Sequence, residues 1–470
     1  MVAEWQTVFL EEAPLEIIDG DSGTNYPNQT EFFGTGHCLF LNAGNVTTNG
    51  FRFSDCAFIT AEKDALLRKG KLHRNDVVLT TRGTVGNAAY FDGAVPFENI
   101  RINSGMVILR ALAPALQPRY LYLFVRSELF RAQVSSLRTG SAQPQPPIRD
   151  INRIEIPVPQ PDEQRAIAHI LGTLDDKIEL NRRMNETLEA MARAIFKSWF
   201  IDFDPVRAKT QGRDPGLPKP IADLFPDRFE GSELGEIPAE WSIASFQEIV
   251  SLNKDTVNPM KTPDTKFFHF SIPAYDESQS PKKEYGAAIR SQKFLVPGDA
   301  VLLSKLNPEI ERVWLVDVKT DECAVCSTEF LVFQAKAPFT RAFLYCLACS
   351  VGIRRELEGL VTGTSKSHQR AQPEAIHNIQ IIVPPPMILK AFSRIVAPLL
   401  DKSQANKRES HAKLFKIASQ NLPFRPISVN GKGNIRKCLA QTLSGLRTAV
   451  QGICELRNLC GFSSHGSENV

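Results

Sequence analysis

The feature that most constrains the fold of this chain is an internal repeat whose two copies lie about 225 residues apart. Residues 174–181 read LDDKIELN and residues 399–406 read LLDKSQAN, with four of the eight positions identical. Other pairs keep the same order: SGMVILRALAP with STEFLVFQAKAP, SLRTGSAQPQ with GLVTGTSKSH, and DINRIEIPVPQP with AIHNIQIIVPPP. Solenoid repeats have periods of roughly 20–50 residues, so a period this long indicates a duplicated domain.

Each copy predicts a globular region, a T-G-S/T loop, an I-x-x-P strand and a long charged helix. In both globular regions two apolar, β-branched runs flank a turn-rich loop, at 75–91 and 298–316. The predicted fold class is therefore α/β mixed (α+β), with two globular domains separated by two long antiparallel, coiled-coil-like helices and an internal pseudo-two-fold repeat. The predicted boundaries are 1–158 and 241–385 for the globular domains, 159–203 and 386–421 for the helical spacers, 204–240 for a Pro/Gly-rich linker, and 422–470 for an atypical tail that matches nothing upstream and for which disorder is one expectation.

The two helices show apolar residues at helical spacing. The first stripe consists of Ile167, Leu171, Leu174, Ile178, Met184, Leu188, Met191, Ile195 and Trp199, and the second of Ile388, Phe392, Ile395, Leu399, Leu414 and Ile417. Asn181 and Asn185 interrupt the first stripe, and Asn406 matches Asn181 in the repeat. A polar residue inside an apolar seam can fix register, so we expect the helices to pair antiparallel, although two separate core helices would also explain the stripes. Pro398 predicts a kink or a break.

Composition excludes several classes of protein. No apolar run reaches the roughly 18–20 residues that span a bilayer, and the N-terminus has acids where an export signal has basic residues, so a cytoplasmic location is expected. The net charge is only +3. A DNA-binding surface must therefore be a local basic patch.

Motifs for catalysis or metal binding are weak. Cys323 and Cys326 form one C-x-x-C and Cys346 and Cys349 another, at a spacing that zinc ribbons use. The second pair, however, falls in a run that the repeat predicts to be an apolar helix, and the first copy has no equivalent cysteines. Incidental thiols are the favoured interpretation. No other catalytic motif is convincing, so the predicted sites contain no catalytic residue and no metal ligand.

The polar loops of the repeat are the candidates for binding DNA. Arginine reads guanine edges, glutamine reads adenine, and serine, threonine and lysine bind phosphates. The predicted DNA-binding residues are Arg82, Thr84, Asn87, Arg138, Thr139, Ser141, Gln143 and Gln145 in the first copy, and Lys305, Asn307, Arg312, Thr364, Lys366, Ser367, His368 and Arg370 in the second. A solvated surface loop is the alternative for each loop taken alone. Because the loop appears in both copies with a constant T-G-S/T and different following residues, we expect a shared loop structure whose sequence specificity differs between the copies.

Longer stretches carry a family resemblance over about residues 1–421. PVPQPDEQRAIAHILGTLDDKIELNRRMNETLEAMARAIFKSWFIDFDPVRAK (157–209), LGEIPAEW (234–241), IIDGDSGTNYP (17–27) and VLLSKLNPEIERVWL (301–315) are similar to sequences of the DNA-specificity subunits of type I restriction–modification systems. The resemblance implies two target-recognition domains that each read half of a split DNA sequence. It also implies a spacer of two antiparallel helices that acts as a ruler for the unread gap.

The resemblance further implies a non-catalytic subunit with several partners. These are double-stranded DNA, two adenine-N6 methyltransferase (modification) subunits and restriction/translocase subunits, which together methylate DNA and defend against foreign DNA. The chain itself is expected to bind no cofactor, since S-adenosylmethionine, ATP and Mg are used by the partner subunits. The tail departs from the family pattern, which leaves a damaged, inactive subunit as one alternative. An enzyme with an unrecognised nuclease or zinc-dependent site is the other.

Overall fold

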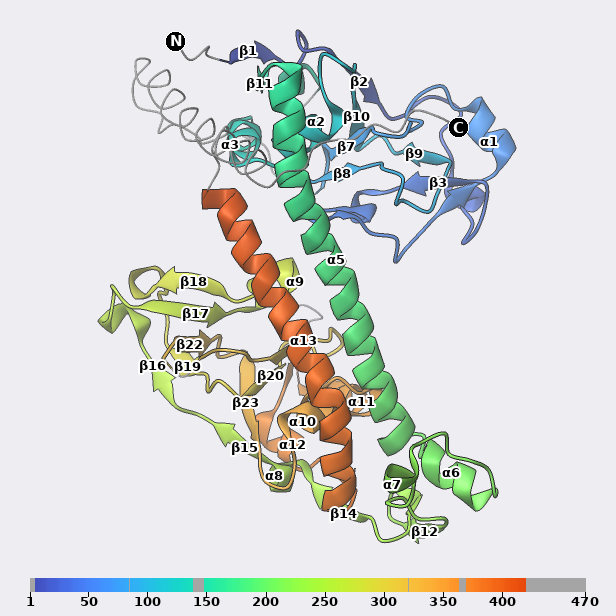
Figure 1. Ribbon diagram of the computed structural model, residues 1–470, viewed down its shortest axis with the longest axis vertical. Helices are drawn as coiled ribbons and strands as arrows, with labels where there is room; N and C mark the ends of the chain where they lie inside the picture. Colours follow the sequence, from blue (N-terminus) through green and yellow to red (C-terminus); the bar gives the residue numbers. More distant parts are fainter. Residues whose placement is uncertain (1–4, 84, 138–147, 320, 363–368, 420–470) are drawn as a thin grey trace, which may run out of the picture. The chain divides into compact units, whose positions relative to one another are not determined.

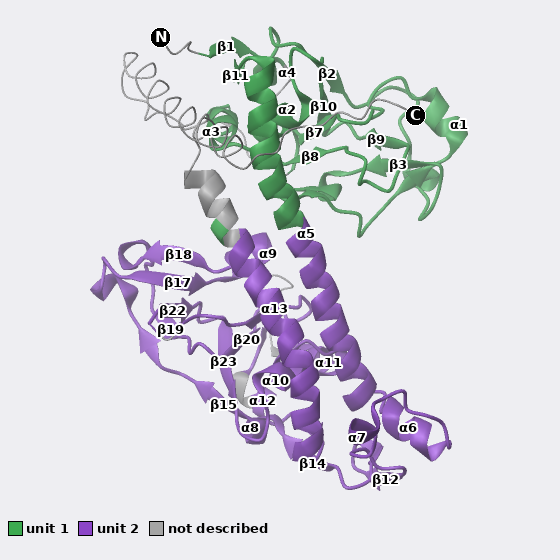
Figure 2. Ribbon diagram, in the orientation of Figure 1, with its two compact units in different colours: residues 1–179, 412–470 green, residues 180–411 purple. Residues whose placement is uncertain are grey.

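The structure is a computed structural model that describes residues 5–83, 85–137, 148–319, 321–362 and 369–419. The chain divides into two compact units, unit 1 with residues 1–179 and 412–470, and unit 2 with residues 180–411 (Figure 2). Helix α5 (Pro161–Phe200) is continuous across the boundary at residue 180. Helix α5 lies within the predicted spacer segment 159–203.

Unit 1 is built on a four-stranded antiparallel sheet in the order β2-β10-β7-β8 (Figure 1). Its strands are β2 (Leu15–Asp19), β10 (Met106–Ala111), β7 (Val77–Thr80) and β8 (Ala88–Tyr90). In β10, Val107 and Leu109 enter one hydrophobic core while Met106 and Ile108 enter another. A sheet covered on both faces needs apolar residues at consecutive positions, which explains the unbroken apolar run of β10.

The remaining elements of unit 1 surround this sheet. Helices α2 (Pro118–Val125) and α3 (Glu128–Ser136) cover one face and bury Tyr120, Phe124 and Phe130 there. The others are β1 (Gln6–Phe9) paired with β11 (Glu155–Val158), a sheet in the order β6-β3-β9 made of β6 (Phe58–Ile59), β3 (Cys38–Leu41) and β9 (Ile100–Ile102), the pair β4 (Val46–Thr47) and β5 (Gly50–Phe51), and helices α1 (Ala61–Leu66) and α4 (Ile148–Asn152).

Unit 2 repeats this topology. Its four-stranded sheet has the order β15-β23-β20-β21, with β15 (Val250–Asn253), β23 (Phe330–Ala335), β20 (Val301–Ser304) and β21 (Val313–Leu315). Each strand takes the place that β2, β10, β7 or β8 has in unit 1. The predicted duplication is confirmed, and so are the strand pairs expected on either side of the two turn-rich loops.

Unit 2 also repeats the accessory elements and adds to them. It contains β14 (Ser242–Ser245) paired with β26 (Gln380–Val383), a five-stranded sheet in the order β16-β19-β22-β17-β18 made of β16 (Thr256–Val257), β19 (Lys293–Leu295), β22 (Cys323–Cys326), β17 (Lys266–Phe270) and β18 (Lys282–Tyr285), the pair β24 (Val361–Thr362) and β25 (Arg370–Ala371), and helices α8 (Phe246–Ile249), α9 (Ile272–Ser278), α10 (Arg341–Ala348), α11 (Val351–Gly359), α12 (Pro373–His377) and α13 (Pro386–Ser419).

The segment predicted as a linker has structure of its own. It forms α6 (Asp204–Thr210), α7 (Lys219–Ala222) and a hairpin of β12 (Phe229–Ser232) and β13 (Gly235–Pro238). Val206, Phe225 and Ile237 are buried in the main core of unit 2. The Pro/Gly content therefore marks turns between short elements packed on that core, whereas a free linker would bury no apolar side chains.

The apolar stripe predicted along α5 is only partly correct. Met184 and Met191 are exposed, while Asn181 and Asn185 are buried together with Ala192. The hydrophobicity pattern was misleading here because the buried seam carries hydrogen-bonded amides at the very positions where a core stripe would be apolar.

Helix α13 continues through Pro398, so the break that this proline allowed does not occur. Among the described residues, no helix is both long and apolar enough to cross a membrane.

Within unit 2 the second part of α5 packs antiparallel against α13. The amide of Asn181 donates to Ser410 (3.2 Å) and Glu409 (2.9 Å), and the amide of Asn406 donates to Asn185 (3.0 Å). Ser403 donates to Glu189 (2.9 Å), so the partner number falls as the α5 number rises. The expected antiparallel seam is confirmed, and the contacts Asn181–Ser410 and Asn406–Asn185 are equivalent under the repeat.

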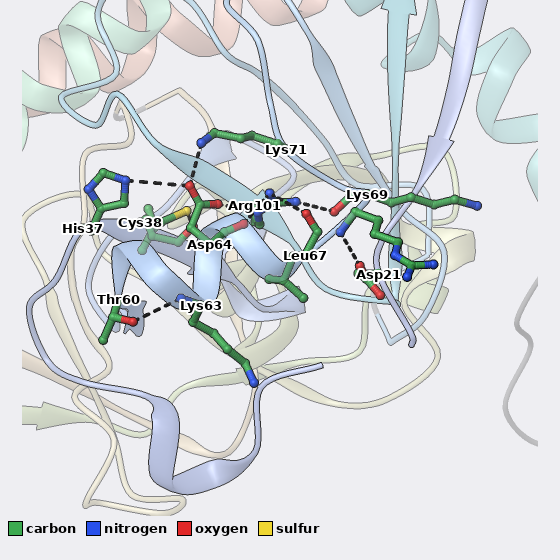
Figure 3. A network of polar contacts seen from close by, with 12 residues as sticks. Asp21, His37, Cys38, Thr60, Lys63, Asp64, Leu67, Lys69, Lys71 and Arg101 are labelled. Atoms are coloured by element: carbon green, nitrogen blue, oxygen red, sulfur yellow. Dashed lines mark hydrogen bonds and ion pairs between the residues drawn. The ribbon is translucent and has the colours of Figure 1, made fainter. Parts of the chain in front are cut away.

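A buried polar network in unit 1 fixes α1 to β9 (Figure 3). Asp64 accepts hydrogen bonds from Arg101 (2.5 Å) and Lys71 (2.6 Å). The remaining donors of Arg101 bind the carbonyls of Asp64, Leu67 and Lys69, which lie in the last turn of α1 and just beyond it. Burial raises the pKa of Asp64, but the bonds from Lys71 and Arg101 outweigh this and hold the pKa below its usual value.

Unit 1 should therefore lose stability in acid through Asp64. A carboxylate whose pKa is depressed on folding stabilises fully above its unfolded pKa of about 3.9, and this contribution disappears as the pH falls below that value. Asp64→Asn should cost about 3 kcal/mol at neutral pH, because Arg101 stays buried without its counter-charge. Urea unfolding from pH 7 to pH 3 measures both effects. Glu98→Gln is the matched control, since Glu98 is exposed and pairs with Arg74 at the surface, and it should change stability by less than about 1 kcal/mol.

Candidate nucleic-acid interface

The two polar loops predicted in the second copy lie side by side in the structure. The loop between β20 and β21 contacts residues 369–371, which include β25, through two backbone hydrogen bonds: Asn307 N to Gln369 O (2.9 Å) and Ala371 N to Lys305 O (3.0 Å). These two bonds flank an antiparallel bridge between Leu306 and Arg370. More than fifty residues separate these segments in the sequence. The structure thus joins two separately predicted loops into one surface, which we call the paired loop.

Arg370 is a charged residue of the paired loop that is both ion-paired and accessible. Its guanidinium donates two hydrogen bonds to the carboxylate of Glu329, at 3.0 and 2.9 Å, and this pairing raises the pKa of Arg370. A two-point contact holds the planar guanidinium in one orientation. The side chain remains about half exposed. Arg370 is therefore presented at the surface in a fixed pose, as a base- or phosphate-reading arginine would be.

Arg312 and Asn307 help to form the internal structure of the paired loop. Arg312 is buried and its guanidinium donates to both carboxylate oxygens of Asp276, at 2.7 and 2.9 Å. Asn307 has φ of 49°, the left-handed region that asparagine tolerates better than most residues. These contacts favour a role for both residues in shaping the paired loop. Lys305 is half-buried and anchors the loop by its backbone, N to Glu329 O (3.0 Å).

Glu311 ties the paired loop to two helices. One oxygen of its carboxylate accepts from Arg193 on α5 at 2.7 Å, and the other accepts from Arg354 on α11. All three residues belong to unit 2. The sequence did not indicate Glu311, Glu329 or Asp276, because each pairs with a residue distant in the chain and a single carboxylate gives no signal of such a partner.

The equivalent loop of unit 1 lies between β7 and β8. The backbone N–H groups of Thr81 and Arg82 donate to the carbonyl of Gly105, at 2.9 and 3.1 Å, and the Arg82 side chain is exposed. Asn87 uses its side-chain amide to hold Val46 O (3.1 Å), so this amide supports the neighbouring strand. Of the two, Arg82 is the better placed to reach a ligand.

The other predicted DNA-binding residues lie outside the described residues. They are Thr84, Arg138, Thr139, Ser141, Gln143, Gln145, Thr364, Lys366, Ser367 and His368. Their assignment stays a prediction.

The cysteine pairs do not form the set of ligands that a zinc ribbon needs. Cys326, Cys346 and Cys349 are buried, whereas Cys323 is exposed. Burial raises the pKa of both Cys326 and Cys349 to about 12, so these thiols stay protonated at neutral pH. In the part of the chain that the structure describes, no three His, Cys, Asp or Glu side chains converge as metal ligands.

Comparison with known proteins gives consistent results. Residues 4–190 match the type I restriction modification DNA specificity domain. The HindI type I restriction enzyme specificity subunit of Haemophilus influenzae is 32% identical over 209 residues, which is 44% of each chain. The MjaIX specificity subunit of Methanocaldococcus jannaschii is 24% identical over 362 residues, 74% of this chain and 76% of that one.

A solved structure shares the fold. The S subunit of a type I restriction–modification system from M. genitalium superposes with a TM-score of 0.54 at 13% identity, covering 90% of this chain and 97% of that one. The similarity therefore extends over both units.

Proposed function

We propose that this chain, which belongs to the family of type I restriction–modification DNA-specificity subunits, is the subunit that reads a bipartite DNA sequence. Each unit would read one half of the target. The observation that carries the proposal is the repeated sheet, which presents an equivalent loop twice, between β7 and β8 and between β20 and β21. Two similar frames with different loop residues suit a target made of two different half-sites.

The chain would act without a cofactor of its own. Adenine-N6 methylation with S-adenosylmethionine, and DNA translocation and cleavage with ATP and Mg, would belong to the methyltransferase and restriction/translocase subunits that it holds. These partners are expected in the cytoplasm with the DNA.

An exposed apolar face on α5 supports the scaffolding part of the proposal. Leu180, Met184 and Met191 follow one another at four and seven residues, so they share one face of the helix. All three are exposed, Met191 by 47%. Apolar side chains gathered on one exposed helix face are typical of a protein interface, and methionine is frequent there because it adapts to its partner. We assign this face to a methyltransferase subunit.

The double substitution Met184→Asp with Met191→Asp should abolish assembly with the methyltransferase subunit. Burying two carboxylates in an apolar contact costs several kcal/mol, which is a loss of affinity of at least a hundredfold. Both residues are exposed, so the free chain should unfold at an unchanged temperature. Analytical ultracentrifugation of the mixed subunits provides the measurement, with Glu186→Lys, an exposed change on the same helix, as the control. Undiminished assembly would place the docking face elsewhere.

Loosening the paired loop should alter one half of the target only. Glu311→Gln keeps the shape of the side chain but leaves Arg193 and Arg354 without their shared counter-charge, so the loop loses its anchor to both helices. We expect binding to the half-site read by unit 2 to weaken by roughly tenfold, corresponding to about 1–2 kcal/mol for a lost charged hydrogen bond. Glu309→Gln, an exposed change in the same loop, should have no effect. Equal losses at both half-sites would argue against a local effect of this anchor.

Methylation mapping tests the function directly. Cells that express this chain with its methyltransferase subunit are compared with cells that express the methyltransferase subunit alone, and adenine-N6 methylation is mapped at single-base resolution. A methylated split motif that depends on the chain would support the proposal and give the target. Exchange of residues 138–150 should then change one half of that motif. If no motif appears although the subunits assemble, the chain is not a working reader. If the purified chain alone cuts or methylates DNA, it is an enzyme.

A further inference from the structure

The outer strand pair of the five-stranded sheet in unit 2, β17 and β18, carries an unusual surface. Strands β17 and β18 pair so that Lys266 lies opposite Tyr285 and Phe268 lies opposite Lys283. Side chains two residues apart on a strand share a face, and directly opposite residues share it too. These four residues therefore lie on one face of the strand pair, which we call the basic–aromatic face. Phe268 is half-buried there against the core of Phe270 and Trp314.

Each lysine of this face makes a cation–π contact with an aromatic ring. The Lys266 ammonium lies 4.9 Å from the centre of the Tyr285 ring, and the Lys283 ammonium lies 4.6 Å from that of Phe268. Both lysines are exposed, and Tyr285 is 51% exposed. Among the described residues, neither lysine has a carboxylate within ion-pair distance. Lys282, the residue before Lys283, lies on the opposite face of β18 and pairs with Glu277 at 2.8 Å.

The fold does not require a basic surface here. In unit 1, strand β3 takes the place of β17, since it pairs parallel with β9 and antiparallel with β6, as β17 does with β22 and β18. All four residues of β3 are buried. Lysines on edge strands often prevent sheets from aggregating, which would account for Lys283 on β18. That explanation fails for Lys266, because β17 has a strand on each side.

We propose that the basic–aromatic face binds the phosphate backbone of double-stranded DNA. Lys266 and Lys283 hold diagonal positions on the strand pair, and their two ammonium groups and the Tyr285 hydroxyl are donors that phosphate oxygens accept. The rings restrict the lysine side chains, so less entropy is lost on binding. The inference rests on the proposed DNA-reading function and adds a contact that is independent of base sequence and specific to unit 2.

The test is the salt dependence of DNA binding by the full chain assembled with its methyltransferase subunit. Two duplexes are used, one with the mapped split motif and one of random sequence. Each lost phosphate contact makes the slope of log K against log[salt] less steep by about 0.9. Lys266→Gln with Lys283→Gln should therefore reduce the slope by about 1.8 on both duplexes, leaving the ratio of their affinities unchanged. Lys266→Arg with Lys283→Arg should keep the slope. Lys282→Gln, which removes one positive charge from the opposite face of β18, is the control and should leave the slope unchanged.

The outcomes separate this inference from the proposed function. If the wild-type complex does not distinguish the two duplexes, the proposed function fails. If it does, but the glutamine variant keeps the wild-type slope or Lys282→Gln reduces the slope equally, the inference is wrong. A loss shared by the glutamine and arginine variants would indicate a packing role and would also overturn it. Loss of the methyltransferase subunit from the glutamine variant would identify the face as a protein contact instead.

Discussion

Replacing Phe392 with alanine should lower the free energy of unfolding of unit 2 by about 3–5 kcal/mol, the range for removing a fully buried aromatic side chain. Phe392 is completely buried on α13, and its ring lies 5.0 Å from Phe200, 6.0 Å from Trp199 and 6.4 Å from Phe343. It thus joins α13, α5 and α10 in one core. The cavity would weaken all three contacts together.

Tryptophan fluorescence during guanidinium unfolding measures this effect selectively. Three of the four tryptophans, Trp199, Trp241 and Trp314, belong to unit 2. The control is Met387→Ala on the same helix, where the side chain is exposed and a change below about 0.5 kcal/mol is expected. A loss of less than about 1 kcal/mol at Phe392 would mean that the aromatic cluster does not hold the helices to the domain.

Changing both Asn181 and Asn406 to leucine should loosen the register of the two long helices. In the native register the amide of Asn181 donates to Ser410 and the amide of Asn406 donates to Asn185. A shifted register would leave these buried amides without hydrogen-bond partners, which costs about 1–3 kcal/mol for each amide. Leucines carry no such penalty, and the population of shifted pairings should rise by roughly tenfold or more. Each single substitution should instead destabilise by about 1–3 kcal/mol, because it leaves one polar partner without a hydrogen bond.

Disulfide trapping distinguishes the registers. Glu189→Cys with Ser403→Cys reports the native register, since these residues are hydrogen-bonded at 2.9 Å. Glu189→Cys with Ser410→Cys reports a register shifted by seven residues. The shifted cross-link should form only in the double-leucine background. If it is equally rare in both backgrounds, packing of the surrounding side chains sets the register and the asparagines do not.

How far the sequence leads depends on whether a signal is local or repeated. The duplication was visible because both copies keep the same order of apolar runs, and the structure confirms it in two sheets of identical strand order. The apolar, β-branched runs within 75–91 and 298–316 predicted the strand pairs β7–β8 and β20–β21 correctly, and β7 and β20 are fully buried because their sheets are covered on both faces. The helical stripe failed at Met184 and Met191, because hydrophobicity alone cannot tell a buried helix face from an exposed one.

The candidate site was likewise predictable only where its signal is repeated along the chain. The sequence indicated which loops carry Arg82, Lys305 and Arg370, because these polar segments recur at equivalent places in the two copies. It could not indicate that Arg312 is buried on Asp276 or that Arg370 is oriented by Glu329, since those pairs form between residues tens of positions apart.

By itself, the sequence determined the duplicated architecture, the two long helices, the asparagines of their seam and the family resemblance, all of which follow from periodicity and repetition along the chain. Only the tertiary structure decided which polar loops form one surface, which charges are buried as anchors and which remain available. The physical reason is that an ion pair or a strand bridge depends on distances of a few ångströms in space. The chain closes those distances only when the sheets and helices have packed.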